Sequence, residues 1–158
     1  MNKVKFFLML SGYQLTWLMC VFGEILLNSF LPGLICGLIF LFLVLINTKN
    51  KKNFFFIVVS ISTIGYLFDS VLVNYKIYNF DSSMYFGVLP IWMLVLWPSF
   101  AALFDEVFTF LSNYKFIAIL LSAILGPLTY YSGSPLGLIY INQLYSFFFL
   151  MITFWIFL

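Results

Sequence analysis

Glu24 and Asp69 are the residues whose types and positions suggest chemistry, because each carboxylic acid lies inside a long apolar run. Placing a carboxylate in lipid costs about 3 kcal/mol on insertion scales, so such groups face protein or water. Two neighbouring acids cannot both ionise cheaply. We therefore expect Asp69 and Glu24 to approach each other or to share a polar neighbour, with at least one of them protonated near neutral pH.

Other polar and aromatic side chains are expected beside these acids, in the outward-facing half of a membrane. Asn142, Tyr66 and Tyr130 are candidate hydrogen-bond partners of Asp69. The candidate ligand- or proton-binding residues are Asp69, Glu24, Asn142, Gln143, Tyr66, Tyr130 and Trp92.

These residues have two interpretations. In the first they are packing contacts, with neutral acids that donate hydrogen bonds inside a helix bundle. In the second they form a polar pocket open to the outside. Lys76 is the one lysine expected on that side, facing Glu24, Asp69 and Asp81, so the charge there is negative and favours a cation or a proton.

The composition excludes several familiar kinds of site. With no histidine, the chain has no usual zinc site and no histidine-based triad or dyad. Cys20 and Cys36 lie in different apolar segments and are expected to be buried thiols. We predict no metal, no cofactor and no catalytic residues. A net charge of +2, spread along the chain, does not indicate a nucleic-acid partner.

The elements that must position these residues are apolar helices. The chain has 158 residues, of which 65% are hydrophobic and 8% charged, far below the charged content of about 25% in soluble domains. About 20 residues in a helix cross the hydrocarbon layer. The sequence therefore predicts an all-α, polytopic transmembrane bundle as a single integral-membrane domain over residues 1–158, with six helices near 6–27, 31–46, 54–74, 86–111, 116–130 and 138–158.

The first helix is expected to remain uncleaved, because its apolar run is too long for a signal peptide and lacks a small-residue cleavage site. One face carries the residues that recur at three- or four-residue steps and should point into the bundle, namely Tyr13, Trp17, Cys20, Glu24 and Asn28.

Lysine placement predicts the orientation. Six of the seven lysines fall at one side in this topology, with Lys3 and Lys5 before the first helix and three more between residues 47 and 53. By the positive-inside rule this side is cytoplasmic, and so are both termini. The acidic pair Asp105 and Glu106 is then expected at the cytoplasmic interface.

Three stretches stand out in the sequence. They are Gly65 with Asp69-Ser70 and Leu72; Pro90-Ile91-Trp92 with Leu96-Trp97 and Phe100-Ala101; and Gly126-Pro127-Leu128 with Tyr130, Gly133 and Leu136-Gly137. Together they resemble a family of small bacterial inner-membrane proteins known as domain of unknown function 2878. Ser132 stands where alanine is expected, and Asp105-Glu106 where a neutral or histidine-containing pair is more usual. The resemblance implies a multi-pass protein of the bacterial inner membrane with an unassigned activity.

Three functional hypotheses follow. We expect a multi-pass membrane protein that binds or moves a small molecule or proton through the outer polar pocket, rather than an enzyme. The alternative is an accessory subunit of a membrane or lipid-modifying system, packed against a membrane-protein partner through the small-residue seam of Ala118, Ser122 and Gly126. The third is a membrane enzyme in which Asp69 and Glu24 act as an acid–base pair on a lipid.

Overall fold

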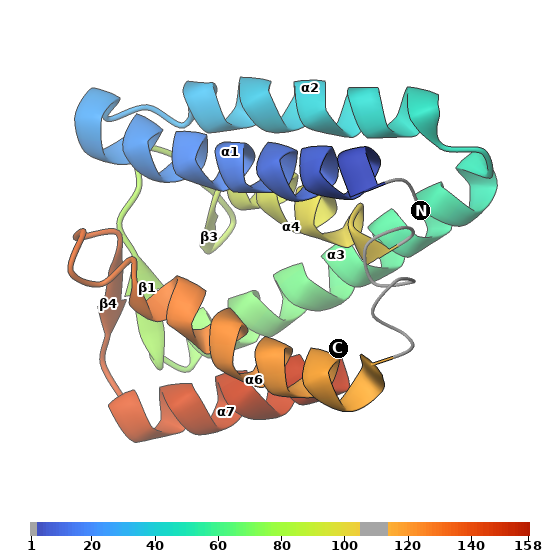
Figure 1. The fold of residues 1–158 in the computed structure, drawn as a ribbon. Coiled ribbons are helices and arrows are strands. Elements are labelled where there is room, and N and C mark those ends of the chain that lie inside the picture. Colours follow the sequence, from blue (N-terminus) through green and yellow to red (C-terminus); the bar gives the residue numbers. More distant parts are fainter. Residues whose placement is uncertain (1–2, 105–113) are drawn as a thin grey trace.

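A computed structural model describes residues 3–104 and 114–158, and helices make up most of this part of the chain (Figure 1). This agrees with the predicted helical class. The helices are α1 (Lys3–Leu27), α2 (Leu31–Asn47), α3 (Lys51–Asn74), α4 (Met93–Ala101), α6 (Lys115–Tyr131) and α7 (Leu144–Phe157). The strands are β1 (Tyr78–Phe80), β2 (Tyr85–Phe86), β3 (Leu89–Pro90) and β4 (Ile139–Ile141).

The helices form two antiparallel hairpins with a third pair between them. Figure 1 shows α1 and α2 side by side at the top, α6 and α7 at the bottom, and α3 crossing between these layers. The short α4 packs on α3 and on the α1–α2 hairpin. Close packing in that hairpin depends on Gly33, where a Cβ would collide with Cys20, and on Gly37, where it would meet Val95 and Thr16.

The described helices expose much apolar surface. Two are long and apolar enough to cross a membrane, Val4–Leu27 and Lys51–Asn74, and α2, α6 and α7 are shorter apolar helices. In the most apolar part of these two helices only 28% and 17% of the residues are buried. Most residues in these parts of the two helices therefore lie at the surface of the described structure.

Two helices begin later than the sequence predicts. The fourth was expected from residue 86, but residues 85–90 form a hairpin in which β2 pairs with β3 and Gly87 has φ +65°. The sixth was expected from residue 138, but Ile139–Ile141 pairs antiparallel with Tyr78–Phe80. Gly137, with φ +75°, precedes this strand and suits a turn better than a helix. The segments between the helices thus pair with each other.

Candidate functional site

Asp69 lies in α3, in the interior of the molecule, with none of its side chain exposed. Its carboxyl oxygens accept hydrogen bonds from three side chains, one of which is shared between the two oxygens. The Tyr78 hydroxyl donates to Oδ1 at 2.6 Å and the Trp97 indole Nε1 donates to Oδ2 at 2.7 Å. The Tyr130 hydroxyl lies 3.0 Å from Oδ1 and 2.8 Å from Oδ2. Every polar atom of this buried acid is therefore satisfied.

The three donors come from three different elements. Tyr78 is in β1, Trp97 in α4 and Tyr130 in α6, so one carboxyl group connects four elements of the fold. An indole N–H can only donate, whereas a tyrosine hydroxyl can donate or accept. The oxygen facing Trp97 must therefore act as an acceptor. If Asp69 is protonated, its hydroxyl donates a hydrogen bond to the oxygen of one of the two tyrosines.

Tyr78 is enclosed by aromatic rings. Its ring meets those of Phe147 and Phe80 edge to face, with centroids 5.7 and 5.4 Å apart. Burial raises the pKa of Tyr78 well above its ordinary value, and the nearby carboxyl of Asp69 raises it further. The hydroxyl therefore keeps its proton at physiological pH and serves as a stable donor to Asp69.

Beside the carboxyl group, two indoles lie between two glycines. Trp97 and Trp155 are stacked, with centroids 6.0 Å apart and ring planes 18° apart. A Cβ at Gly65 in α3 would collide with the Trp97 ring, and one at Gly126 in α6 would collide with the Trp155 ring. The missing side chains let both indoles lie against helix backbone.

Glu24, near the end of α1, binds a different part of the chain. The side chain is 6% exposed, and its Oε1 accepts a hydrogen bond from the Ser82 hydroxyl at 2.6 Å. Ser83 donates from its backbone N–H to Oε2 at 2.8 Å and from its hydroxyl to Oε1 at 3.2 Å. Glu24 thus holds the loop between β1 and β2 against α1.

The structure does not bring Glu24 and Asp69 onto a shared partner. Within residues 3–104 and 114–158, the hydrogen-bond partners of Asp69 are Tyr78, Trp97 and Tyr130, and those of Glu24 are Ser82 and Ser83. The predicted bond between Asp69 and Tyr130 is confirmed. The prediction that Glu24 and Asp69 share a hydrogen-bond partner is wrong, because the β1–β2 loop supplies Glu24 with separate donors.

The predicted partners Asn142 and Tyr66, and the candidate binding residue Gln143, bind backbone instead of Asp69. Asn142 Nδ2 and Gln143 Nε2 lie 3.2 and 3.5 Å from the carbonyl oxygen of Lys76, which has φ +55°. The Tyr66 hydroxyl donates to the carbonyl oxygen of Phe86 at 2.7 Å. These three side chains therefore fasten the loops that follow α3 and β1.

The small-residue seam of α6 packs inside the chain. Gly126 lies against Trp155 of α7, and the Ser122 hydroxyl donates to the carbonyl oxygen of Trp155 at 2.8 Å. This part of the seam is therefore covered by α7. Asp105 and Glu106, the predicted interfacial acids, lie outside the residues that the structure describes.

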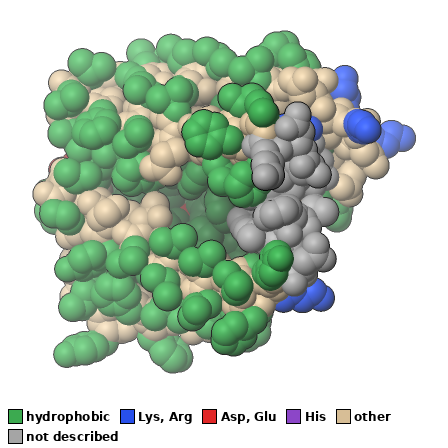
Figure 2. Space-filling view, viewed as in Figure 1, with side chains coloured by type: hydrophobic (Ala, Val, Ile, Leu, Met, Phe, Trp, Pro, Cys, Tyr) green, Lys and Arg blue, Asp and Glu red, His purple; other side chains and the backbone are tan. Residues whose placement is uncertain are grey.

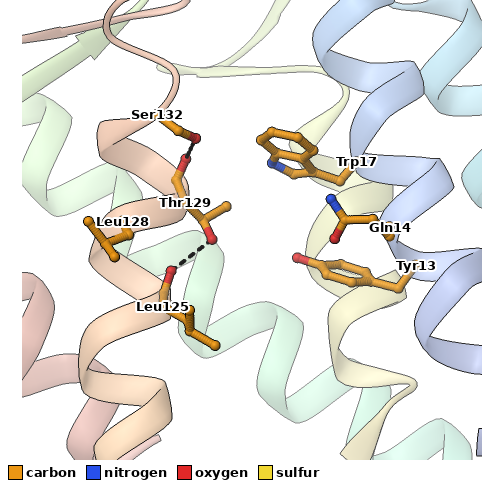
Figure 3. Close-up of a pocket in the computed structure, with 7 residues that line it drawn as sticks. All are labelled: Tyr13, Gln14, Trp17, Leu125, Leu128, Thr129 and Ser132. Carbon is orange, nitrogen blue, oxygen red and sulfur yellow. Dashed lines mark hydrogen bonds between the residues drawn. The ribbon is translucent and has the colours of Figure 1, made fainter.

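A cleft of about 240 Å³ separates α1 from α6. Figure 3 shows Tyr13, Gln14 and Trp17 of α1 facing α6 across this gap. The opposite wall carries Leu125, Leu128 and Thr129 of α6 and Ser132 just beyond it. Figure 2, in the same view as Figure 1, shows the molecule hollowed between an upper and a lower band of hydrophobic side chains.

A second, smaller cavity of about 40 Å³ shares Trp17 and Thr129 with the cleft. Trp92 and Tyr130 also line it, together with Phe80, so it reaches the side chain that binds Asp69. Trp92 is 5% exposed, and its indole Nε1 is buried without a hydrogen-bond partner in the described part of the protein. The two cavities form one candidate site between the helix hairpins.

Sequence reasoning found part of this candidate site. Trp92 and Tyr130 are candidate residues from the sequence, and Tyr13 and Trp17 belong to the face of the first helix expected to point inward. Gln14, Thr129 and Ser132 were missed. They are single neutral polar residues, and only the placement of α1 opposite α6 brings them to the same cleft. Among the described residues, no group of three or more His, Cys, Asp or Glu side chains could hold a metal ion.

Comparison with known proteins relates nearly the whole chain to a protein family. A family model described as a protein of unknown function, DUF2878, matches residues 7–158. No curated protein and no solved structure matches the chain.

Proposed function

Because the chain belongs to the DUF2878 family of proteins of unknown function, we propose a function from its geometry: it is a multi-pass membrane protein that binds a small molecule between α1 and α6. The cleft of about 240 Å³ carries this proposal. It lies in the side of the helix bundle, where a molecule dissolved in the bilayer reaches it directly. Binding, or movement of the bound molecule between the membrane faces, fits this position better than catalysis, since no acid, cysteine or lysine in the described part of the chain lines either cavity.

Two observations support a membrane location. Large apolar side chains are exposed along the helices, including Phe42 on α2, Phe56 on α3 and Phe116 on α6, each more than 60% exposed. Such a surface is costly in water and suited to lipid. The lysines visible in Figure 2 gather at one end of the molecule, which is the end that holds both chain termini in Figure 1. A bundle inserted with that end in the cytoplasm satisfies the positive-inside rule.

The chemistry of the cleft supports a ligand site. Gln14 and Tyr13 point across the gap in Figure 3, and neither side chain has a hydrogen-bond partner within the described segments. Polar groups without partners are rare on a membrane-facing surface, because lipid tails offer no hydrogen bonds. A bound molecule with polar atoms supplies the missing partners.

The acids have a supporting role in this proposal. Asp69 and Glu24 line neither cavity, and their oxygens are already occupied by protein donors. Asp69 fixes the Tyr130 hydroxyl, and the ring of Tyr130 forms part of the smaller cavity. The carboxyl group is therefore a positioning group for one wall of the site. The contacts of Asp69 and Glu24 do not support direct binding of a cation by these acids.

Filling the cleft tests the proposal. Leu125 in the cleft wall is 56% exposed, so tryptophan fits there without disturbing the core, but it occupies ligand space. The matched control is Ile124→Trp, at a neighbouring position that is 49% exposed and lines neither cavity. We expect mass spectrometry of small molecules bound to the purified protein to show one that is retained in Ile124→Trp and reduced at least fivefold in Leu125→Trp. Equal retention of every bound molecule by both variants would refute the proposal.

A further inference from the structure

From the two cavities we infer the class of ligand: a neutral amphiphile whose head carries hydroxyl groups and whose adjoining carbonyl oxygen reaches Trp92, as in a monoacylglycerol. This inference rests on the proposed function and specifies the molecule that the cleft would take from the bilayer.

The charge of the walls requires a neutral head. Among the described residues, the side chains around both cavities are aromatic, aliphatic, hydroxyl or amide groups, and none carries a charge. A phosphate or ammonium group that leaves water for such a site loses hydration without gaining a counter-charge. Uncharged polar heads avoid that penalty.

The hydrogen-bond capacity of the walls favours hydroxyl groups. Thr129 Oγ1 already donates to the Leu125 carbonyl at 2.8 Å, and Ser132 Oγ donates to the Thr129 carbonyl at 2.7 Å (Figure 3). A hydroxyl has a single hydrogen, so these two oxygens offer only acceptor lone pairs to a ligand. Opposite them, the Gln14 amide and the Tyr13 hydroxyl can donate. A head that both donates and accepts, as an alcohol does, matches the two walls.

The indole of Trp92 indicates that the ligand also carries a hydrogen-bond acceptor. The Trp92 indole N–H is buried and lacks a partner among the described residues, and the residue itself lines the smaller cavity. Leaving a buried donor unpaired is unfavourable, and an indole nitrogen can be satisfied only by an acceptor. Much of the remaining lining, including Val21, Met93 and Leu138, is apolar. An ester carbonyl at the start of an acyl chain meets both conditions.

The volumes of the two cavities indicate how much of the ligand they can enclose. The larger cavity corresponds to about eight waters at ~30 Å³ each, and the smaller to about one. This is below the usual 300–1,000 Å³ of sites that enclose a whole drug-sized molecule. A glycerol head and its ester group fit these spaces, and the acyl chain remains outside against the apolar faces of α1 and α6.

Photolabelling tests the neutral head. The full-length protein in lipid nanodiscs is irradiated with a monoacylglycerol that carries a diazirine near the start of its acyl chain, or with a lysophosphatidic acid that has the same chain. We expect saturable labelling of residues 10–17 and 125–132, at least fivefold stronger with the neutral probe. Equal or stronger labelling of these segments by the phosphate probe overturns the inference of a neutral head.

Competition tests the role of Trp92. An unlabelled ester-linked monoacylglycerol should compete with the neutral probe about two- to tenfold better than its ether-linked analogue, which lacks the carbonyl, since one hydrogen bond has about this effect. In Trp92→Phe this ratio should fall to about one. Trp155→Phe should keep it, because the Trp155 indole N–H is also buried without a partner in the described residues but Trp155 lines neither cavity. An unchanged ratio in Trp92→Phe overturns the assignment of the carbonyl to Trp92.

Two different outcomes would refute the ligand class and the cleft as a binding site. If Leu125→Trp loses a bound molecule but the neutral probe shows no saturable labelling, the ligand class is wrong and the cleft is still a binding site. If neither a bound molecule nor labelling responds to Leu125→Trp, the cleft is not a binding site and both proposals are refuted.

Discussion

Trp97 and Trp155 stack between two helices that each provide a glycine, and this stack lies beside the carboxyl group of Asp69. Gly65 precedes Asp69 by four residues in α3, and Gly126 precedes Tyr130 by four residues in α6. Residues four apart share one face of a helix. The indole pair and the hydrogen bonds to Asp69 therefore form adjacent layers of one contact between the middle and lower helix pairs.

The first prediction concerns these glycines. Gly65→Ala should destabilise the protein by about 1–3 kcal/mol, because its Cβ collides with the Trp97 ring and overpacked cores lose about this much. Gly126→Ala should have a similar effect through Trp155. Thermal unfolding in detergent micelles, followed by fluorescence, measures the loss.

The control for the glycines is the exposed neighbour Ile64. Ile64→Ala changes the same helix at a side chain that is 50% exposed, and should alter stability by less than about 0.5 kcal/mol. Alanine also has a higher helix propensity than glycine. An increase in stability in Gly65→Ala would therefore show that helix propensity, and not the indole contact, governs this position.

The second prediction compares two substitutions of Asp69. Leucine leaves the donors of Tyr78, Trp97 and Tyr130 buried without an acceptor, and each unpaired donor costs about 1–3 kcal/mol. We expect Asp69→Leu to prevent stable folding. In Asp69→Asn, the new amide offers its oxygen to Trp97 and its hydrogens to the tyrosine oxygens, so this variant should fold with a smaller loss of stability. Equal yields and melting temperatures for the two variants would contradict a structural role for these hydrogen bonds.

The third prediction separates the role of Glu24 from that of Asp81, an acid at the start of the loop that Glu24 binds. Glu24→Ala removes the acceptor of Ser82 and Ser83, so amide hydrogen exchange in residues 81–86 should speed up at least tenfold. Asp81→Asn changes an exposed acid at the base of the same loop and should leave exchange unchanged. If both variants exchange alike, the contact with Glu24 does not hold the loop.

The sequence predicts that Asp69 faces protein, and it offers Tyr130 as one of three candidate partners, of which Tyr130 alone binds Asp69 in the described residues. An acid in the middle of an apolar helix must find donors, and a tyrosine near the outer end of another helix is within reach. It does not reveal Tyr78 or Trp97 as partners. Tyr78 reaches Asp69 only because the chain turns back after α3, with Lys76 at φ +55°, and Trp97 only because Gly65 lets the indole lie on α3.

The cleft is harder to predict than the helices that form it. Hydrophobic runs identify α1 and α6, but their separation depends on how the hairpins pack against α3 and α4. Gln14, Thr129 and Ser132 are unremarkable in the sequence and meet only in space. The strands are also hard to predict. The apolar residues Ile139–Ile141 read as the start of a helix in the sequence, and only their pairing with β1 in the structure identifies them as a strand.

The last prediction concerns orientation in the membrane. α1 begins at Lys3, the turn between α2 and α3 holds Lys49, Lys51 and Lys52, and α6 begins at Lys115. These helix ends lie at one end of the molecule in Figure 1, and β1 and β4 lie at the other. Because positively charged loops stay in the cytoplasm, a reporter active only there should be active when fused after Lys52 and inactive after Ser82.

A second reporter, active only outside the cytoplasm, should give the opposite pattern at the same two positions. The fusion after Ser82 leaves α1, α2 and α3 intact, so its location reports the direction in which three apolar helices insert. Replacing Lys49, Lys51 and Lys52 with glutamine should weaken the preference without unfolding the helices, since Thr48 and Asn50 provide the hydrogen bonds at this turn. Cytoplasmic activity after Ser82 combined with none after Lys52 would reverse the topology and place the cleft's polar end, near Ser132, on the cytoplasmic side.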